Sequence, residues 1–132
     1  MKIAVDTHAL LWYLQGSTRL SRRARATIDD GVQLGGVVVS MGVVFDLVYL
    51  TEKGKLPVAA MQQVRHVIDD PVQPFTLAPV TSSVMDSFIA PAPTRLPDPW
   101  DRLIVATAVS EGLSLVTRDE LITESRLVQT IW

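Results

Sequence analysis

The segment MKIAVDTHALLW, residues 1–12, decides the class of fold. Residues 2–6 form a short apolar run that ends in an acid, which is typical of a buried strand. An apolar segment at 9–14 follows directly and predicts a short helix that ends at Gly16. A strand that passes at once into a helix is the unit from which α/β proteins are built, so this segment predicts the start of a parallel sheet.

The rest of the chain repeats this alternation of strand and helix. Further strands are predicted at 37–40, 75–77, 113–117 and 127–131, and helices at 21–29, 41–53, 57–69, 82–89 and 100–111, with a helical turn at 120–124. Ser21 suits a helix N-cap, Pro57 suits a first helical turn, and Gly54 suits a helix end. We therefore predict an α/β fold with a mostly parallel sheet.

A proline-rich segment interrupts the alternation at residues 90–99, which contain Pro91, Pro93, Pro97 and Pro99. Each proline lacks an amide donor and has a fixed φ, so the segment cannot form a helix or a central strand. We predict an extended loop and no domain boundary, because the elements after it complete the sheet. Residues 1–132 are thus expected to form a single domain.

The composition is that of an ordinary globular protein. Its 132 residues, 48% of them hydrophobic, are enough for one domain with a core. No apolar run reaches the roughly 18 residues that cross a bilayer, and the acid at position 6 comes too early for a signal peptide. The absence of cysteine excludes disulfides, thiolate zinc sites and a cysteine nucleophile. We expect a cytoplasmic protein with no membrane partner.

The charge balance bears on nucleic-acid binding. A net charge of −2, from 12 basic and 14 acidic residues, argues against a general nucleic-acid coat. It does not exclude a nuclease, because an acidic cluster can lie beside a local basic patch. The densest patch is interpreted either as the solvated face of a helix or as a surface for phosphates or an acidic partner, and it contains Arg19, Arg22, Arg23 and Arg25.

Four acids lie where apolar runs meet turns or helices: Asp6, Asp46, Asp101 and Asp119. Burying such charges is costly unless they are paired or bound to a metal. Asp6 and Asp119 both follow predicted strands, and sites in open α/β sheets lie at the carboxyl ends of strands. Oxygen ligands without cysteine favour Mg²⁺, with Mn²⁺ as the second candidate, over zinc. The competing interpretation is that each aspartate only caps a helix, which is less convincing for four acids together.

A divalent cation held by carboxylates suits phosphodiester hydrolysis, because it lowers the pKa of a bound water and neutralises the leaving oxygen. An aspartate-nucleophile phosphatase is less favoured, since the position two residues after the strand-end acid is His8. For His8, a packed or hydrogen-bonded role is favoured over a role as metal ligand. The three tryptophans Trp12, Trp100 and Trp132 are interpreted as core or interface residues, with stacking on RNA bases as the less favoured alternative.

Three segments resemble the signatures of one family. Residues 1–12 (MKIAVDTHALLW), 97–108 (PDPWDRLIVATA) and 111–119 (EGLSLVTRD), with the final Ile131-Trp132, are similar to PIN-domain ribonucleases, specifically the VapC-type toxins of type II toxin–antitoxin systems. The resemblance spans essentially the whole chain. It implies a three-layer α/β/α PIN-like fold with about five strands, and an Mg²⁺-dependent endoribonuclease acting on RNA. It also implies a cognate antitoxin protein and a homodimer.

The same resemblance assigns roles to individual residues. It makes Asp6 the first metal ligand, Asp101 the third acid and Asp119 the fourth. Thr117 becomes the hydroxyl that helps to hold the carboxylates. Asp98 is an additional acid that caps the helix, aids the site or shapes the loop, and we favour the cap.

The chain departs from the family pattern in its middle segment. Phe45 and Asp46 stand where the family usually has Trp and Glu, and Val43 replaces a common hydroxyl. Asp46 is one methylene shorter than glutamate and is expected to reach a metal less well. Gly42 is expected to weaken its helix by about 1 kcal/mol relative to alanine. The alternative to an active ribonuclease is therefore a PIN-like binding or scaffold module with a weakened site.

Overall fold

Five short strands, apolar and largely buried, form one sheet. The computed structural model describes residues 1–92 and 95–132, and the strand order in its sheet is β3-β2-β1-β4-β5. The strands are β1 (Ile3–Val5), β2 (Val37–Ser40), β3 (Phe75–Ala78), β4 (Leu115–Val116) and β5 (Thr130–Ile131). All the strand pairs are parallel, and Ala4 of β1 pairs with both Val38 of β2 and Leu115 of β4. The predicted parallel sheet is confirmed.

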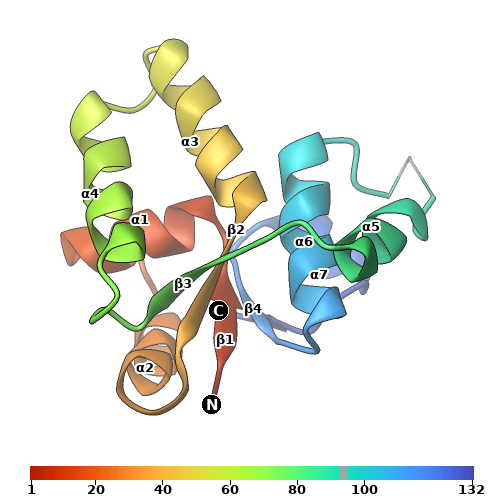
Figure 1. The fold of residues 1–132 in the computed structure, drawn as a ribbon, viewed down its shortest axis with the longest axis horizontal. Coiled ribbons are helices and arrows are strands. Elements are labelled where there is room, and N and C mark those ends of the chain that lie inside the picture. Colours follow the sequence, from red (N-terminus) through yellow and green to blue (C-terminus); the bar gives the residue numbers. More distant parts are fainter. Residues whose placement is uncertain (93–94) are drawn as a thin grey trace.

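Helices cover both faces of this sheet. They are α1 (Thr7–Gln15), α2 (Arg22–Asp30), α3 (Met41–Glu52), α4 (Val58–Asp69), α5 (Ser82–Ile89), α6 (Pro99–Ser110) and α7 (Glu120–Ser125). In Figure 1, α1 and α4 lie on one side of the sheet and α5 and α6 lie on the other. This is the expected three-layer α/β/α fold. Within the described ranges, no helix has the length and apolar character needed to span a membrane.

Most of the predicted elements occur at or near their predicted positions, and two strands differ. The strands β4 and β5 are shorter than the predicted 113–117 and 127–131, in part because the amide of Leu113 donates to the carbonyl of Ala108 at 2.9 Å and belongs to the end of α6. A π-helical turn at Gly31–Gly35 was not predicted. Pro93 and Thr94 of the predicted extended segment lie outside the described residues.

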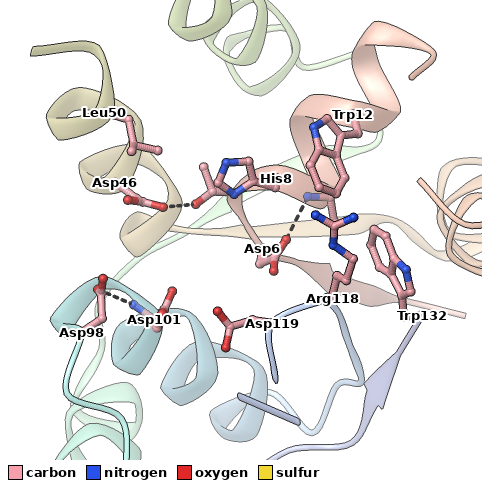
Figure 2. A pocket seen from close by; sticks show the side chains of 12 residues that line it. Asp6, His8, Trp12, Asp46, Leu50, Asp98, Asp101, Arg118, Asp119 and Trp132 are labelled. Carbon is pink, nitrogen blue, oxygen red and sulfur yellow. Dashed lines mark hydrogen bonds between the residues drawn. The ribbon is translucent and has the colours of Figure 1, made fainter. Parts of the chain in front are cut away.

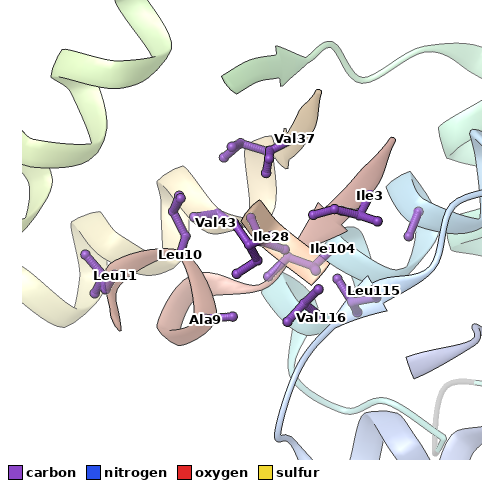
Figure 3. Close-up of a cluster of buried hydrophobic side chains, with 14 of the residues drawn as sticks. Ile3, Ala9, Leu10, Leu11, Ile28, Val37, Val43, Ile104, Leu115 and Val116 are labelled. Carbon is purple, nitrogen blue, oxygen red and sulfur yellow. The ribbon is translucent and has the colours of Figure 1, made fainter. Parts of the chain in front are cut away.

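The layers share one hydrophobic core. Its fully buried members include Ile3 and Val37 from the sheet, Ile28 from α2 and Ile104 from α6 (Figure 3). Val43 of α3 is also fully buried in this cluster. Position 43, where the family usually carries a hydroxyl, therefore contributes a packing side chain in this protein.

Gly42 allows α3 to lie directly against α6. A Cβ at this position would lie 2.7 Å from the carbonyl oxygen of Trp100 and 3.0 Å from Cγ1 of Ile104. From the sequence, Gly42 was expected only to weaken its helix, and this close contact with α6 could not be predicted. The glycine is needed because backbone from the neighbouring helix occupies the place of a side chain.

We expect Gly42→Ala to lower the free energy of unfolding by about 1–3 kcal/mol, because overpacking must displace the backbone of α6. Helix propensity alone would make the same substitution stabilising by about 1 kcal/mol. Urea unfolding distinguishes the two signs. Gly16→Ala serves as the control, because Gly16 has φ +63° and nothing within 4 Å, so alanine there is strained without a clash. A more stable Gly42→Ala protein would contradict the packing argument.

Candidate functional site

Acidic side chains from separate elements converge on one cavity, whose volume is about 360 Å³. Its acidic lining residues are Asp6, Asp46, Asp98, Asp101 and Asp119. Figure 2 shows these carboxylates around the same space. All four acids chosen from the sequence thus lie at one site, with Asp98 as a fifth.

Asp6 and Asp119 are linked through Thr117. Asp6 follows β1 and caps α1 by accepting from the amide of Ala9 at 2.9 Å, while the hydroxyl of Thr117 donates to its other oxygen. The same hydroxyl accepts from the amide of Asp119 at 3.0 Å. Burial raises the pKa of Asp6, and the hydrogen bonds from Thr117 and Ala9 oppose that rise. Asp119 in turn caps α7 by accepting from the amide of Ile122 at 2.9 Å.

The start of α6 holds the next two acids. Asp98 is the N-cap and accepts from the amides of Trp100 at 2.8 Å and Asp101 at 3.2 Å, so the favoured interpretation of Asp98 as a helix cap is confirmed. Asp101 lies in the first turn. Burial raises the pKa of Asp101 to about 7, and repulsion from four neighbouring carboxylates, those of Asp98, Asp119, Asp46 and Asp6, adds to the rise. The acids therefore form one electrostatic cluster.

Asp46 reaches the cavity from α3. The hydroxyl of Thr7 donates to Oδ2 of Asp46 at 2.7 Å, which ties the start of α1 to α3. Burial raises the pKa of Asp46, the bond from Thr7 opposes this, and the charge of Asp98 adds to it. Asp46 thus lies close enough to Asp101 for its charge to add to the rise in the pKa of Asp101.

The sequence signature of this site matches a known family. The PIN domain model matches residues 3–124, a range that includes every acid of the cavity. The chain belongs to the PIN-domain family. Along its length it is similar to Ribonuclease VapC22 of Mycobacterium tuberculosis, with 29% identity over 133 residues that cover 98% of each protein.

Solved PIN-like structures share the fold. The crystal structure of VapBC2 from Rickettsia felis bound to a promoter DNA fragment contains a chain that matches with a TM-score of 0.71 and 13% identity, covering 98% of this chain and 97% of that one. A toxin–antitoxin complex from Klebsiella pneumoniae matches with a TM-score of 0.64 and 17% identity, covering 96% and 94%. At these identities the comparison supports the PIN-like architecture and nothing finer.

The acids of this PIN domain offer the oxygen ligands that Mg²⁺ and Mn²⁺ prefer. Among the residues that the structure describes, no three acidic or histidine side chains form a ready ligand set for one ion. Mg²⁺ does not require such a set, because it keeps several waters and binds proteins through one or two carboxylates. Burial and mutual repulsion raise the pKa of Asp101, and a divalent cation would offset that excess of negative charge. The residues therefore fit a hydrated divalent cation.

Some lining residues of the PIN cavity were not identified from the sequence. Thr7 and Arg118 both line it, and each stands next to an acid in a signature segment, which is the only sequence feature that marks them.

Two of the tryptophans have the packing roles expected from the sequence. Trp12 is only 8% exposed and belongs to the core. Trp100 stacks on Tyr49, with 5.4 Å between the ring centroids.

Proposed function

We propose that this PIN domain is an Mg²⁺-dependent endoribonuclease that hydrolyses RNA phosphodiester bonds at the acidic cavity. The observation that carries the proposal is the convergence of Asp6, Asp46, Asp101 and Asp119 on one cavity. In this proposal Asp6, Asp101 and Asp119 hold the hydrated ion, directly or through its waters, with Mn²⁺ as the second candidate, and Asp46 is the fourth catalytic acid. The full-length similarity to Ribonuclease VapC22 supports RNA as the substrate.

Hydrogen bonds hold the acidic side chains of the site in fixed orientations. A bound divalent cation would supply a water of lowered pKa and stabilise the charge on the leaving oxygen. Thr117 orients Asp6, Thr7 orients Asp46, and the cap made by Asp98 fixes the turn that carries Asp101. Groups fixed in advance need no rearrangement when the reaction occurs, which is the largest advantage of an enzyme site over water.

We also propose that the chain is the toxin of a toxin–antitoxin pair and is inhibited by a cognate antitoxin protein in the cytoplasm. One of its structural neighbours is a chain of a toxin–antitoxin complex from Klebsiella pneumoniae, which supports this partner class. Expression of the chain should arrest growth, and co-expression of the antitoxin should relieve the arrest.

A homodimer is part of the same proposal. An apolar cavity of about 320 Å³ lies between α5 and α6, and the exposed side chains of Val80, Met85 and Ile89 line it. Exposed apolar surface of this kind marks interaction sites. Light scattering of the purified chain measures its oligomeric state directly.

The function is tested by incubating single-stranded RNA with the purified chain and Mg²⁺ or Mn²⁺. We expect cleavage by the wild type, and loss of cleavage with a chelator or with Asp6→Asn. Asp86→Asn is the matched control, because Asp86 is exposed on α5 and is not a lining residue of the acidic cavity. A wild-type protein that binds no metal and cuts no RNA would support the alternative, a PIN-like binding or scaffold module.

Asp46→Glu tests whether the shorter acid limits the rate. We expect glutamate to raise metal affinity or to increase the cleavage rate by up to about tenfold, which corresponds to about 1.4 kcal/mol of better transition-state contact. The rate constant at saturating Mg²⁺ and the Mg²⁺ concentration at half-maximal rate are the two measurements. Asp86→Glu is the control for the added methylene. An unchanged rate and Mg²⁺ dependence would mean that Asp46 is already accommodated or lies outside the reaction.

A further inference from the structure

Arg118 is the arginine that lines the acidic cavity. It stands between Thr117 and Asp119, at the point where the chain leaves β4. Its guanidinium carbon lies 4.7 Å from the ring centroid of Trp12 and 6.0 Å from that of Trp132. Figure 2 shows Arg118 beside these two indoles, on the same side of the cavity as Asp6.

This arginine is not used to neutralise the acids around it. In residues 1–92 and 95–132, the only ion pair joins Arg65 to Asp69 on the surface of α4, and Arg118 makes no hydrogen bond through its guanidinium. Arg102 shows the contrast, because its guanidinium donates to the carbonyl oxygens of Phe88 at 2.8 Å and Pro91 at 3.3 Å. Arg102 thus fastens α6 to the end of α5, whereas the donors of Arg118 are free to bind a ligand.

The indoles determine how those donors are presented. Stacking against an aromatic face fixes a guanidinium by attraction to the ring electrons, and it leaves the N–H groups at the edge of the plane available. Trp12 is itself held, since it is buried in the core and its ring centroid lies 5.9 Å from that of Trp132. The planar fork of an arginine matches the oxygens of a phosphate and can bind them with two parallel hydrogen bonds.

The negative charge of the cavity explains why an RNA strand would need the positive charge of Arg118. Five carboxylates line the cavity, and they repel the phosphates of an RNA strand. A strand that brings one phosphodiester to the acids therefore needs a cation to hold a neighbouring phosphate. Arg118 lines the same cavity as the carboxylates, and its guanidinium can donate hydrogen bonds to the oxygens of a phosphate.

We propose that Arg118, held in place by Trp12 and Trp132, binds a phosphate of the RNA strand next to the phosphodiester that is cut. This proposal rests on the proposed function, since it assigns a substrate contact to the same site. Arg118 is in this view a substrate-binding residue, and the two tryptophans are positioning residues.

The test measures RNA binding separately from cleavage. The Asp101→Asn protein is kept in a chelator, and its affinity for a mixed-sequence single-stranded RNA is measured over a range of salt concentrations. Arg118→Met keeps the length of the side chain and removes the charge, while Arg118→Lys keeps the charge and removes the planar fork. We expect Arg118→Met to weaken binding by about tenfold, the scale of one charge-assisted contact, and to reduce the salt slope by about 0.7, the value for one phosphate of a single strand. Arg118→Lys should keep the salt slope and bind more weakly than arginine.

Arg65→Met is the matched control, because Arg65 is an exposed arginine on α4 and does not line the acidic cavity. It should leave the affinity and the salt slope unchanged. An unchanged slope in a folded Arg118→Met protein would overturn the assignment and leave Arg118 as a packing residue of the two indoles. An equal loss in Arg65→Met would also overturn it, because overall charge would then explain both effects. If the parent protein binds no RNA although the wild type cleaves RNA with Mg²⁺, this assignment fails and the proposed function stands; if the wild type cleaves no RNA either, the proposed function fails.

Discussion

Replacing Asp101 with asparagine is expected to lower the rate of RNA cleavage by at least about a hundredfold, the scale of removing one preorganised electrostatic group. The same substitution should raise the melting temperature of the metal-free protein above neutral pH. Both effects have one cause. Asp101 lies where burial and the charges of four other carboxylates oppose its ionisation, and a ligand for a cation must be ionised.

The pH dependence follows from the direction of the shift. Folding raises the pKa of Asp101 from 3.8 to about 7, so the folded protein favours the protonated carboxyl. The stability that this group contributes is complete below about pH 4 and is lost as the pH rises through about 7. Asparagine resembles the protonated acid at every pH. The difference in melting temperature between Asp101→Asn and the wild type should therefore grow from pH 4 to pH 8 in a chelator.

The melting temperatures are then measured again with added Mg²⁺. A ligand that binds only the folded state stabilises it, so Mg²⁺ should raise the melting temperature of the wild type more than that of Asp101→Asn. Asp86→Asn is again the control and should follow the wild-type curve at every pH. A pH-independent difference between Asp101→Asn and the wild type would contradict the electrostatic cluster, even if cleavage were lost.

The strands and acids could be predicted from the sequence because their positions follow from local pattern and topology. The short β-branched run before Ser40 is typical of a buried strand. Because helices are predicted between successive strands, the strands are expected to be parallel and covered on both faces. Parallel strands bring their carboxyl ends to one edge, so Asp6 and Asp119 had to lie near each other. Neither inference depends on the direction of any long side chain.

The rest of the site depends on contacts between elements, which a single sequence does not encode locally. Gly42 suggested a weak helix, yet the backbone of α6 lies so close to it that a Cβ there would be 2.7 Å from the carbonyl oxygen of Trp100. Val43 suggested a lost site hydroxyl, yet it packs in the core. The hydroxyl that does reach the acid of α3 comes from Thr7, which is 39 residues away in the chain. Each of these roles depends on a contact between residues of different helices or layers.

Thr117→Val is expected to lower the free energy of unfolding by about 1–3 kcal/mol, the cost of leaving buried polar groups without a partner. Thr117 is only 1% exposed, and its hydroxyl both donates to Asp6 and accepts from the amide of Asp119. Valine keeps the shape and removes both bonds. The pKa of Asp6, which burial already raises, should rise further because the bond from Thr117 lowers it. Cleavage should slow by about tenfold to a hundredfold, and its acid limb should move to higher pH.

Thr117→Ser separates the hydroxyl from the packing. Serine retains both hydrogen bonds and loses one buried methyl group, so it should reduce stability by about 1 kcal/mol and leave the acid limb of the pH profile in place. Urea unfolding and the pH dependence of cleavage, measured on both variants, test these two statements. A Thr117→Val protein that cuts RNA at the wild-type rate would mean that Asp6 needs no orientation from β4. In that case the link between the two acids would serve the fold, and the metal hypothesis would have to rest on Asp101 and Asp119.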